Sequence, residues 1–169
     1  MQRPSLFTIT LPVLLGYIPL GITFGFLMVS QGIAWYIPIL FSIFVFAGAA
    51  QFLAVGLVVN HASLLDTAIA TFLINLRHVF YGLSLFDFLP HTWAKRLYFM
   101  FGITDETYSL LTSSKSANPS NALPIVALNQ SYWVAGTAIG ALLATSLSPI
   151  KGIEFSLTAL FVILLVEQI

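Results

Sequence analysis

The sequence contains no cysteine and very little charge. Without cysteine the chain forms no disulfide, no thiolate nucleophile and no cysteine-ligated metal site. Its three histidines, His61, His78 and His91, are dispersed and match no HxxH or HExxH spacing, so we expect neither a metal site nor a cofactor. Six Lys and Arg residues balance six Asp and Glu residues, which leaves a net charge of zero and no basic stripe for nucleic acid.

The shortage of charge also excludes a soluble domain. Charged residues make up 7% of the chain and hydrophobic residues 59%, whereas a soluble domain carries about 25% charged residues because its surface faces water. The mean hydropathy is +0.98. Lipid is the solvent in which this composition is stable, so the first partner that we expect is the lipid bilayer. The sequence predicts an all-α, polytopic transmembrane helix bundle.

About five to six apolar segments divide the chain, and a spanning helix needs about 20 such residues. The segments are, in order, Leu6 to Val29, Ile37 to Val59, Leu65 to Phe86, Leu97 to Leu111, Leu123 to Leu147 and Phe155 to Ile169. The fourth, with about 15 residues, reaches about 22 Å as a helix, so we expect it to be tilted, broken or re-entrant, or to extend into its flanks. We expect one transmembrane domain over residues 1–169, without a clear internal repeat and incomplete at its C-terminus.

The third segment carries a cation near its middle. Arg77 lies too deep for easy snorkelling to either interface, and an arginine at such depth costs about 2.5–3.5 kcal/mol on insertion scales. It therefore needs a partner or water. A polar and small stripe follows helical spacing along an adjoining face, and its members are Thr67, Thr71, Asn75, His78 and Gly82. We favour a substrate or proton pathway here, with a structural network between helices as the alternative.

The fourth segment carries two adjacent acids, Asp105 and Glu106, within an otherwise apolar stretch. Burial and mutual repulsion oppose the ionisation of both acids, whereas a nearby arginine favours it. We expect one of the two to pair with Arg77 and the other to remain free to take up a proton, with His78 as a second candidate proton carrier. The alternative is that both acids sit in an interfacial turn beside a short helix.

Prolines and glycines interrupt the first segment. Because proline removes a backbone hydrogen bond, we expect the first helix to be broken, and Pro19 and Gly21 are then candidate binding positions at a half-helix end. Gly21 and Gly25 also form a face of small residues suited to close helix packing, which is the alternative role. Packing is likewise the simplest role of a stripe in the fifth segment, formed by Gly136, Gly140 and Ala144.

Small residues also gather just past the middle of the second segment, in the run Ala47-Gly48-Ala49-Ala50-Gln51. Such residues allow close approach of backbones or leave the volume of a cavity. Gln51 adds a polar group at that depth, which makes it a further candidate for the pathway.

Four blocks of the sequence resemble the AzlC-type branched-chain amino-acid exporters, the azaleucine-resistance family. The blocks are Gly16 to Gly25, Phe46 to Phe52, Asn75 to Gly82 and Phe101 to Glu106. The resemblance implies a multi-pass permease of the bacterial inner (plasma) membrane that exports valine, leucine, isoleucine or their analogues. It also implies a large subunit that works with a small AzlD-type membrane protein, in a family whose members are typically longer than this chain.

With this resemblance, the leading hypothesis is a secondary active exporter of small apolar amino acids. A zwitterion needs a cationic contact for its carboxylate, from Arg77 or a half-helix end, and an anionic contact for its ammonium, from Asp105 or Glu106. Proton coupling through His78 or Glu106 is a further hypothesis. We expect no enzyme, because Ser84 lacks the surrounding motif of a membrane serine protease. The main alternative is a structural or regulatory membrane subunit without transport activity of its own.

Overall fold

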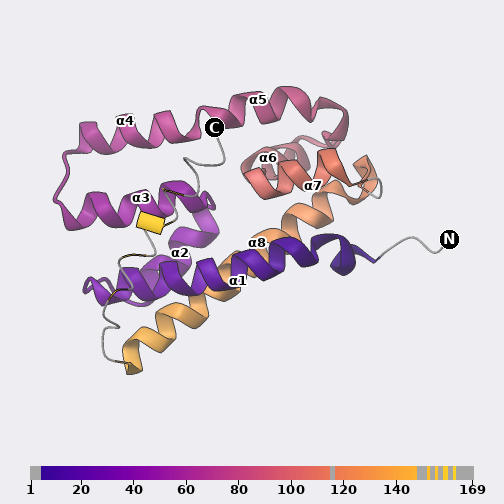
Figure 1. Cartoon of the computed structure of the whole chain (residues 1–169). Coiled ribbons are helices and arrows are strands. Elements are labelled where there is room, and N and C mark those ends of the chain that lie inside the picture. The colour runs from indigo at the N-terminus through magenta and orange to yellow at the C-terminus, as the bar shows by residue number, and fades with distance from the viewer. Residues whose placement is uncertain are drawn as a thin grey trace.

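The computed structural model describes residues 5–114 and 117–147, together with residues 152, 155, 158, 159 and 162 (Figure 1). Every regular element in these residues is a helix, as the sequence predicts. The elements are α1 (Leu6–Ser30), α2 (Tyr36–Phe44), α3 (Gly48–Val59), α4 (Leu64–Asn75), α5 (Arg77–Ser84), the 3-10 turn η1 (Phe86–Phe88), α6 (Trp93–Phe101), α7 (Asp105–Ser113) and α8 (Pro119–Ser146). The predicted sixth segment, Phe155 to Ile169, lies largely outside the described residues.

The two longest helices, α1 and α8, run in the same direction, pack against each other and form the centre of the fold (Figure 1). With 25 and 28 residues they are about 37 and 42 Å long. Their backbones touch, since a Cβ on Gly21 would lie 2.9 Å from Thr137 N and one on Gly136 would lie 2.7 Å from Ile18 O. The predicted packing role of both glycine stripes is confirmed. Among the described residues, α1 is the one helix long and apolar enough to cross a membrane by length and composition.

Helix α1 runs unbroken through Pro12 and Pro19, so the predicted break in the first helix is wrong. Both prolines lie on the exposed side of α1, where a missing backbone hydrogen bond leaves the seam with α8 intact. Close packing of Gly21 and Gly25 against the backbone of α8 fixes the helix over the same stretch. The first helix therefore offers no half-helix end to a substrate.

The second apolar segment is a hairpin of α2 and α3, and the prediction of one helix from Ile37 to Val59 is corrected. The chain reverses at Phe46, whose φ of 41° lies in the left-handed region that residues other than glycine rarely adopt. Gln51 Nε2 donates a 3.0 Å hydrogen bond to Ser42 Oγ across the reversal. In a continuous helix these two residues would be about 13 Å apart along the axis.

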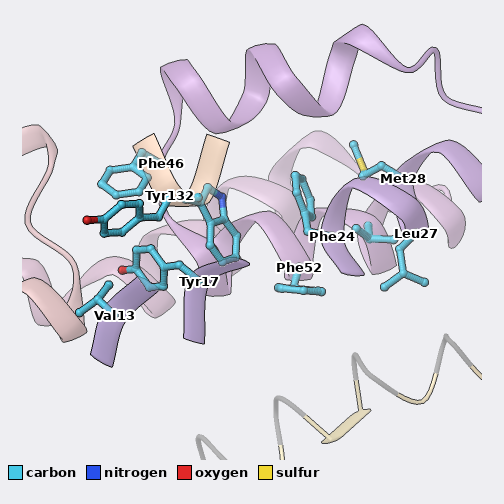
Figure 2. Close-up of a cluster of buried hydrophobic side chains, with 10 residues drawn as sticks. Val13, Tyr17, Phe24, Leu27, Met28, Phe46, Phe52 and Tyr132 are labelled. Atoms are coloured by element: carbon cyan, nitrogen blue, oxygen red, sulfur yellow. The ribbon is translucent and has the colours of Figure 1, made fainter. Parts of the chain in front are cut away.

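An apolar cluster holds this first hairpin against α1 (Figure 2). The Phe24 ring of α1 contacts Phe41 of α2 and Phe52 of α3, with ring centroids 6.3 and 5.7 Å apart. Tyr17, at the middle of α1, contacts Phe46 at the tip, with centroids 6.4 Å apart. Both arms of the hairpin therefore lie beside the C-terminal half of α1, and the tip reaches its middle.

Helices α4 and α5 form one long element with a break at Leu76, which confirms the predicted third segment. The element runs against the direction of α1 and α8, because Leu85 at its far end packs with Ile9 and Ala122 near the starts of those helices (Figure 1). No residue of α4 or α5 is buried. The polar stripe is half-buried, whereas the outer face is apolar and exposed, with Leu64 at 91% and Phe80 at 68%. An apolar outer face is what a lipid-facing helix requires.

The fourth segment is a second hairpin, made of α6 and α7, so among the predicted alternatives the structure shows a broken element that also extends into its flanks. Its tip comprises residues 102–104. Phe99 of α6 and Leu111 of α7 share a buried cluster with Ala122 and Ile125, near the start of α8. This hairpin therefore occupies the end of the molecule opposite to the first hairpin. The two tips meet near the middle, where the rings of Phe46 and Phe101 are 6.4 Å apart.

Candidate functional site

A pocket that is partly open to the outside lies where the hairpin tips meet the long helices. Segments far apart in the sequence build it, and the lining residues are Tyr17, Leu20, Phe46, Ala47, Gly48, Ala49, Phe52, Arg77, His78, Thr104, Asp105, Glu106 and Trp133.

Arg77 and Asp105 form an ion pair in this pocket. Arg77 begins α5 and Asp105 begins α7, so each charge is placed by the start of a short helix. Asp105 Oδ1 also accepts a 2.8 Å hydrogen bond from Tyr81 Oη. The side chains are 27% and 33% exposed, and the buried Arg77 Nε has no hydrogen-bond partner among the described residues. The pair is one of the two pairings that the sequence predicts, and it retains capacity to bind a ligand.

Glu106 is the second carboxylate of the pocket, and its surroundings differ from those of Asp105. Its side chain is exposed, and Oε2 accepts a 2.7 Å hydrogen bond from Tyr17 Oη. Within the described part of the chain no Lys, Arg or His forms an ion pair with it. The pocket thus contains a carboxylate whose charge is available to an ammonium group.

A hydroxyl network positions these acids. Thr104 precedes α7, and its side chain accepts from Thr107 N, so it caps the helix start. Thr104 Oγ1 lies 2.6 Å from Tyr17 Oη, and Asn129 Nδ2 of α8 donates to Thr107 Oγ1 at 2.9 Å. The positive end of the α7 dipole favours both carboxylates in its first turn.

The rest of the lining is largely apolar and aromatic. Phe46, Phe52 and Trp133 are almost fully buried, and Leu20 stands beside them. Trp133 is fixed in place because its Nε1 donates a 2.9 Å hydrogen bond to Gln51 Oε1. This surface suits an aliphatic group.

The tip of the first hairpin adds small residues and an open helix end. Helix α3 begins at Gly48, and no side chain caps its first N–H groups. A Cβ added to Gly48 would lie 3.3 Å from Trp133 Cη2. The predicted effect of the small residues at 47–49, which is to leave room for a cavity, is confirmed.

Of the nine residues predicted to form the pathway, the pocket brings together four, namely Arg77, His78, Asp105 and Glu106. His78 lies beside Tyr81, with ring centroids 5.6 Å apart, and its Nδ1 lies 3.1 Å from Asn75 O. The functional role of these four side chains stays a prediction.

The other five predicted residues do not line the pocket. Gln51 is fully buried and its amide bonds to Ser42 and Trp133, while Gly21 lies in the seam between α1 and α8. Pro19 lies on the exposed side of α1. Asn75 and Thr71 bond to each other along α4, where Asn75 Nδ2 donates to Thr71 O at 2.9 Å.

The sequence reasoning missed Tyr17, Thr104 and Trp133 as pocket residues. Tyr17 and Thr104 carry hydroxyl groups in the middle of apolar segments, close to Pro19 and Asp105 in the sequence. That position is the signal that could have identified them. Nothing in the spacing of Trp133 distinguishes it from a lipid-facing tryptophan. In the described residues no group of three His, Asp or Glu side chains is placed to hold a metal ion.

Comparison with known proteins agrees with this architecture. The model of the AzlC protein family matches residues 12–147. A membrane protein of Helicobacter pylori is 37% identical over 164 residues, which cover 94% of this chain and 72% of that protein. The branched-chain amino acid transport protein AzlC of Bacillus subtilis is 35% identical over 169 residues, which cover 97% of this chain and 66% of that protein.

A third relative is the inner membrane protein YgaZ of Escherichia coli, which is 30% identical over 139 residues, 78% of this chain and 57% of that protein. The chain thus spans about two thirds of the length of these relatives. No solved structure matches it. Because the family match and the relatives cover most of the sequence, this chain is a membrane protein that belongs to the AzlC family.

Proposed function

We propose that this chain is a multi-pass transporter of the bacterial inner membrane that exports branched-chain amino acids such as valine, leucine or isoleucine. The observation that carries the proposal is the composition of the pocket. A sheltered Arg77–Asp105 pair stands beside an aromatic and aliphatic lining, together with Glu106, a carboxylate that pairs with no cation in the described part of the chain. The Bacillus subtilis relative is a branched-chain amino acid transport protein, which supports the same class of substrate.

Each part of a branched-chain amino acid has a counterpart in this pocket. The substrate ammonium binds Glu106, which needs a cation. The carboxylate binds the guanidinium of Arg77, whose Nε has no hydrogen-bond partner among the residues that the structure describes, and the open N-terminus of α3 adds positive potential. The aliphatic side chain packs against Phe52 and Trp133. Charges of both signs next to an apolar surface select a zwitterion over a simple acid, amine or hydrocarbon.

We infer that this site lies near the middle of a bilayer. In the proposed arrangement α1, α4–α5 and α8 cross the membrane, and each hairpin enters from a different side and returns to it. Backbone without regular hydrogen bonds is tolerated at that depth only where it lines a cavity or is buried in protein, and both tips meet this condition. Broken helices of this kind place ion and substrate sites near the midplane of transporters.

Export is proposed to be secondary active, with proton coupling through Glu106 or His78. Because Glu106 has no cationic partner within residues 5–114 and 117–147, we propose that it alternates between binding an ammonium group and binding a proton. Among the described residues there is no phosphate-binding loop that would supply energy from a nucleotide. A small AzlD-type membrane protein is the proposed partner.

Efflux of labelled leucine from preloaded cells tests the proposal, with and without the small partner. We expect Arg77→Ala and Asp105→Asn to abolish efflux while the protein still inserts into the membrane. Arg96→Ala and Asp87→Asn, which remove the same charges at exposed positions outside the pocket, serve as matched controls and should export normally. Normal export by the two pocket variants would contradict the assignment of Arg77 and Asp105 to the substrate site. A wild-type chain that inserts but exports in neither setting would favour a structural or regulatory subunit.

A further inference from the structure

The elements of the first half of the chain recur in the second half at a nearly constant spacing. Helix α2 covers residues 36–44 and α6 covers residues 93–101, so both ends of α6 follow those of α2 by 57 positions. The start of α7 at Asp105 follows the start of α3 at Gly48 by the same 57 positions. Helix α1 covers 25 residues, and α4, α5 and η1 together cover residues 64–88, which is the same length.

The two halves point in opposite directions. Helix α1 and the α4–α5 element are antiparallel, and each is followed by a hairpin that turns back beside it (Figure 1). The first hairpin packs with the C-terminal half of α1, and the second packs with the starts of α1 and α8. Equivalent positions of the two tips, Ala47 and Thr104, both line the pocket.

We propose that residues 6–59 and 64–113 are two inverted copies of one unit, a long helix followed by a hairpin. On this view, which rests on the proposed transport function for its second step, the hairpins are two equivalent gates. Each gate separates the shared pocket from a different side of the membrane. Opening one gate at a time would expose the pocket to the two sides in turn.

One side chain on α8 joins the two gates. Gln130 Nε2 donates a 3.0 Å hydrogen bond to Ile43 O in the first hairpin, and Gln130 Oε1 accepts a 2.7 Å hydrogen bond from Tyr98 Oη in the second. A single amide on α8 therefore binds both hairpins in this structure. If one hairpin moves away, the remaining hydrogen bond of Gln130 would hold the other hairpin in its closed position.

The absence of cysteine allows a direct test of the inverted repeat. Single cysteines are placed at Tyr36, Asn60, Trp93 and Thr112, the outer ends of the hairpin arms, all of which are exposed. Labelling with a membrane-impermeant maleimide is then compared between right-side-out and inverted vesicles. We expect Tyr36→Cys and Asn60→Cys to label from one side, and Trp93→Cys and Thr112→Cys to label from the other.

The alternative topology, in which both segments cross the membrane, predicts a different pairing. Tyr36→Cys would then share a side with Trp93→Cys, and Asn60→Cys would share the opposite side with Thr112→Cys. That result would overturn the inverted repeat even if the chain exports leucine. The expected labelling in a chain that exports nothing would instead leave the repeat intact and contradict the proposed function.

The gates are tested with a reporter cysteine at the pocket, Ala47→Cys. Tyr98→Phe removes the hydrogen bond to the second hairpin alone, so we expect labelling of the reporter to rise several-fold from the side of that hairpin. Gln130→Leu removes both hydrogen bonds and should raise labelling from both sides. Unchanged labelling in both variants, or an increase from one shared side, would contradict the role of the hairpins as opposite gates.

Discussion

The two hairpin tips occupy equivalent places in the fold but carry different chemistry. The first tip presents Ala47, Gly48 and Ala49, and α3 begins there without a side-chain cap. The second tip presents Thr104, Asp105 and Glu106, and Thr104 caps the start of α7. Equivalent geometry gives the pocket two helix N-termini, while the difference in side chains makes one end open and small and the other end acidic.

Because of this difference, the two ends of the pocket attract groups of opposite charge. A positive helix end without a carboxylate attracts an anionic group, whereas the end with two carboxylates attracts a cation. Arg77 pairs with Asp105, whereas Glu106 forms no ion pair among the described residues. The proposed function then predicts one orientation for a bound zwitterion, with its ammonium at the second tip and its aliphatic side chain against Trp133.

The largest effect is expected from removing the unbalanced charge at the second tip. Glu106→Gln keeps the shape and the hydrogen bond from Tyr17 but loses the attraction for an ammonium group. A hydrogen bond to a charged group contributes about 1.5–3 kcal/mol, so leucine binding should weaken by roughly 10- to 150-fold. Equilibrium binding of labelled leucine to the purified protein measures this. Asp87→Asn is the control, and an equal loss there would show that the effect is not specific to the pocket.

The next effect is expected from filling the first tip. Gly48→Ala places a Cβ 3.3 Å from Trp133 Cη2 and narrows the apolar part of the pocket. One methylene in such a site is worth about 1–3 kcal/mol, so binding of leucine should fall by about tenfold or more relative to alanine. Competition between the two amino acids gives the ratio. Gly16→Ala, where a Cβ meets no atom within 4 Å, should leave the ratio unchanged.

A third effect, on stability, is expected from disturbing the packing of the second tip against α8. A Cβ on Gly102 would collide with Val126 Cγ1, so Gly102→Ala should destabilise the protein by about 1–3 kcal/mol. The melting temperature in detergent reports the loss. The double variant Gly102→Ala/Val126→Ala makes room for the new methyl group and should recover part of it. If the double variant melts lower than Gly102→Ala, steric contact between these residues is not the cause.

The smallest of these effects is expected from removing the hydrogen bonds of Gln51 that stabilise the first tip. Gln51→Leu leaves the Trp133 N–H without its acceptor and Ser42 without its amide donor, which should cost about 1–2 kcal/mol of stability. The expected change is a lower melting temperature with a small change in leucine affinity, because Gln51 does not line the pocket. A loss of binding without a loss of stability would instead return Gln51 to the list of binding residues.

Much of the polar chemistry could be predicted from the sequence. An arginine and an acid in the middle of apolar segments must be paired, and the pair of Arg77 and Asp105 follows from that requirement. The short fourth segment could not cross a bilayer as a simple helix, so its break was also predictable. Both glycine stripes indicated close packing, although their spacing did not indicate that α1 and α8 pack against each other.

The first hairpin could not be predicted in the same way. The segment from Ile37 to Val59 has the length and apolarity of a spanning helix, and no proline marks the turn at Phe46. The reversal depends on contacts between distant residues, such as those of Gln51 with Ser42 and Trp133. The prolines of α1 predicted a break that does not occur. A proline on the exposed side of a helix bends it only where packing permits the bend.

The proposed internal repeat could not be predicted from the sequence, because its two copies share spacing and not residues. At the tips, Ala47-Gly48-Ala49 stands where the other copy has Thr104-Asp105-Glu106. Composition and hydropathy differ between these stretches, so a comparison of residues finds no similarity. Only the positions of the helix ends reveal the relation.

Protection of the pocket by substrate tests the central claim most directly. In the cysteine-free chain, leucine should slow maleimide labelling of Ala47→Cys and leave labelling of Tyr36→Cys unchanged. Isopentylamine, which lacks the carboxylate, and 4-methylpentanoate, which lacks the ammonium, should protect far less at the same concentration. A pocket that leucine does not protect, or that all three compounds protect equally, would contradict a site for zwitterionic branched-chain amino acids between the two hairpin tips.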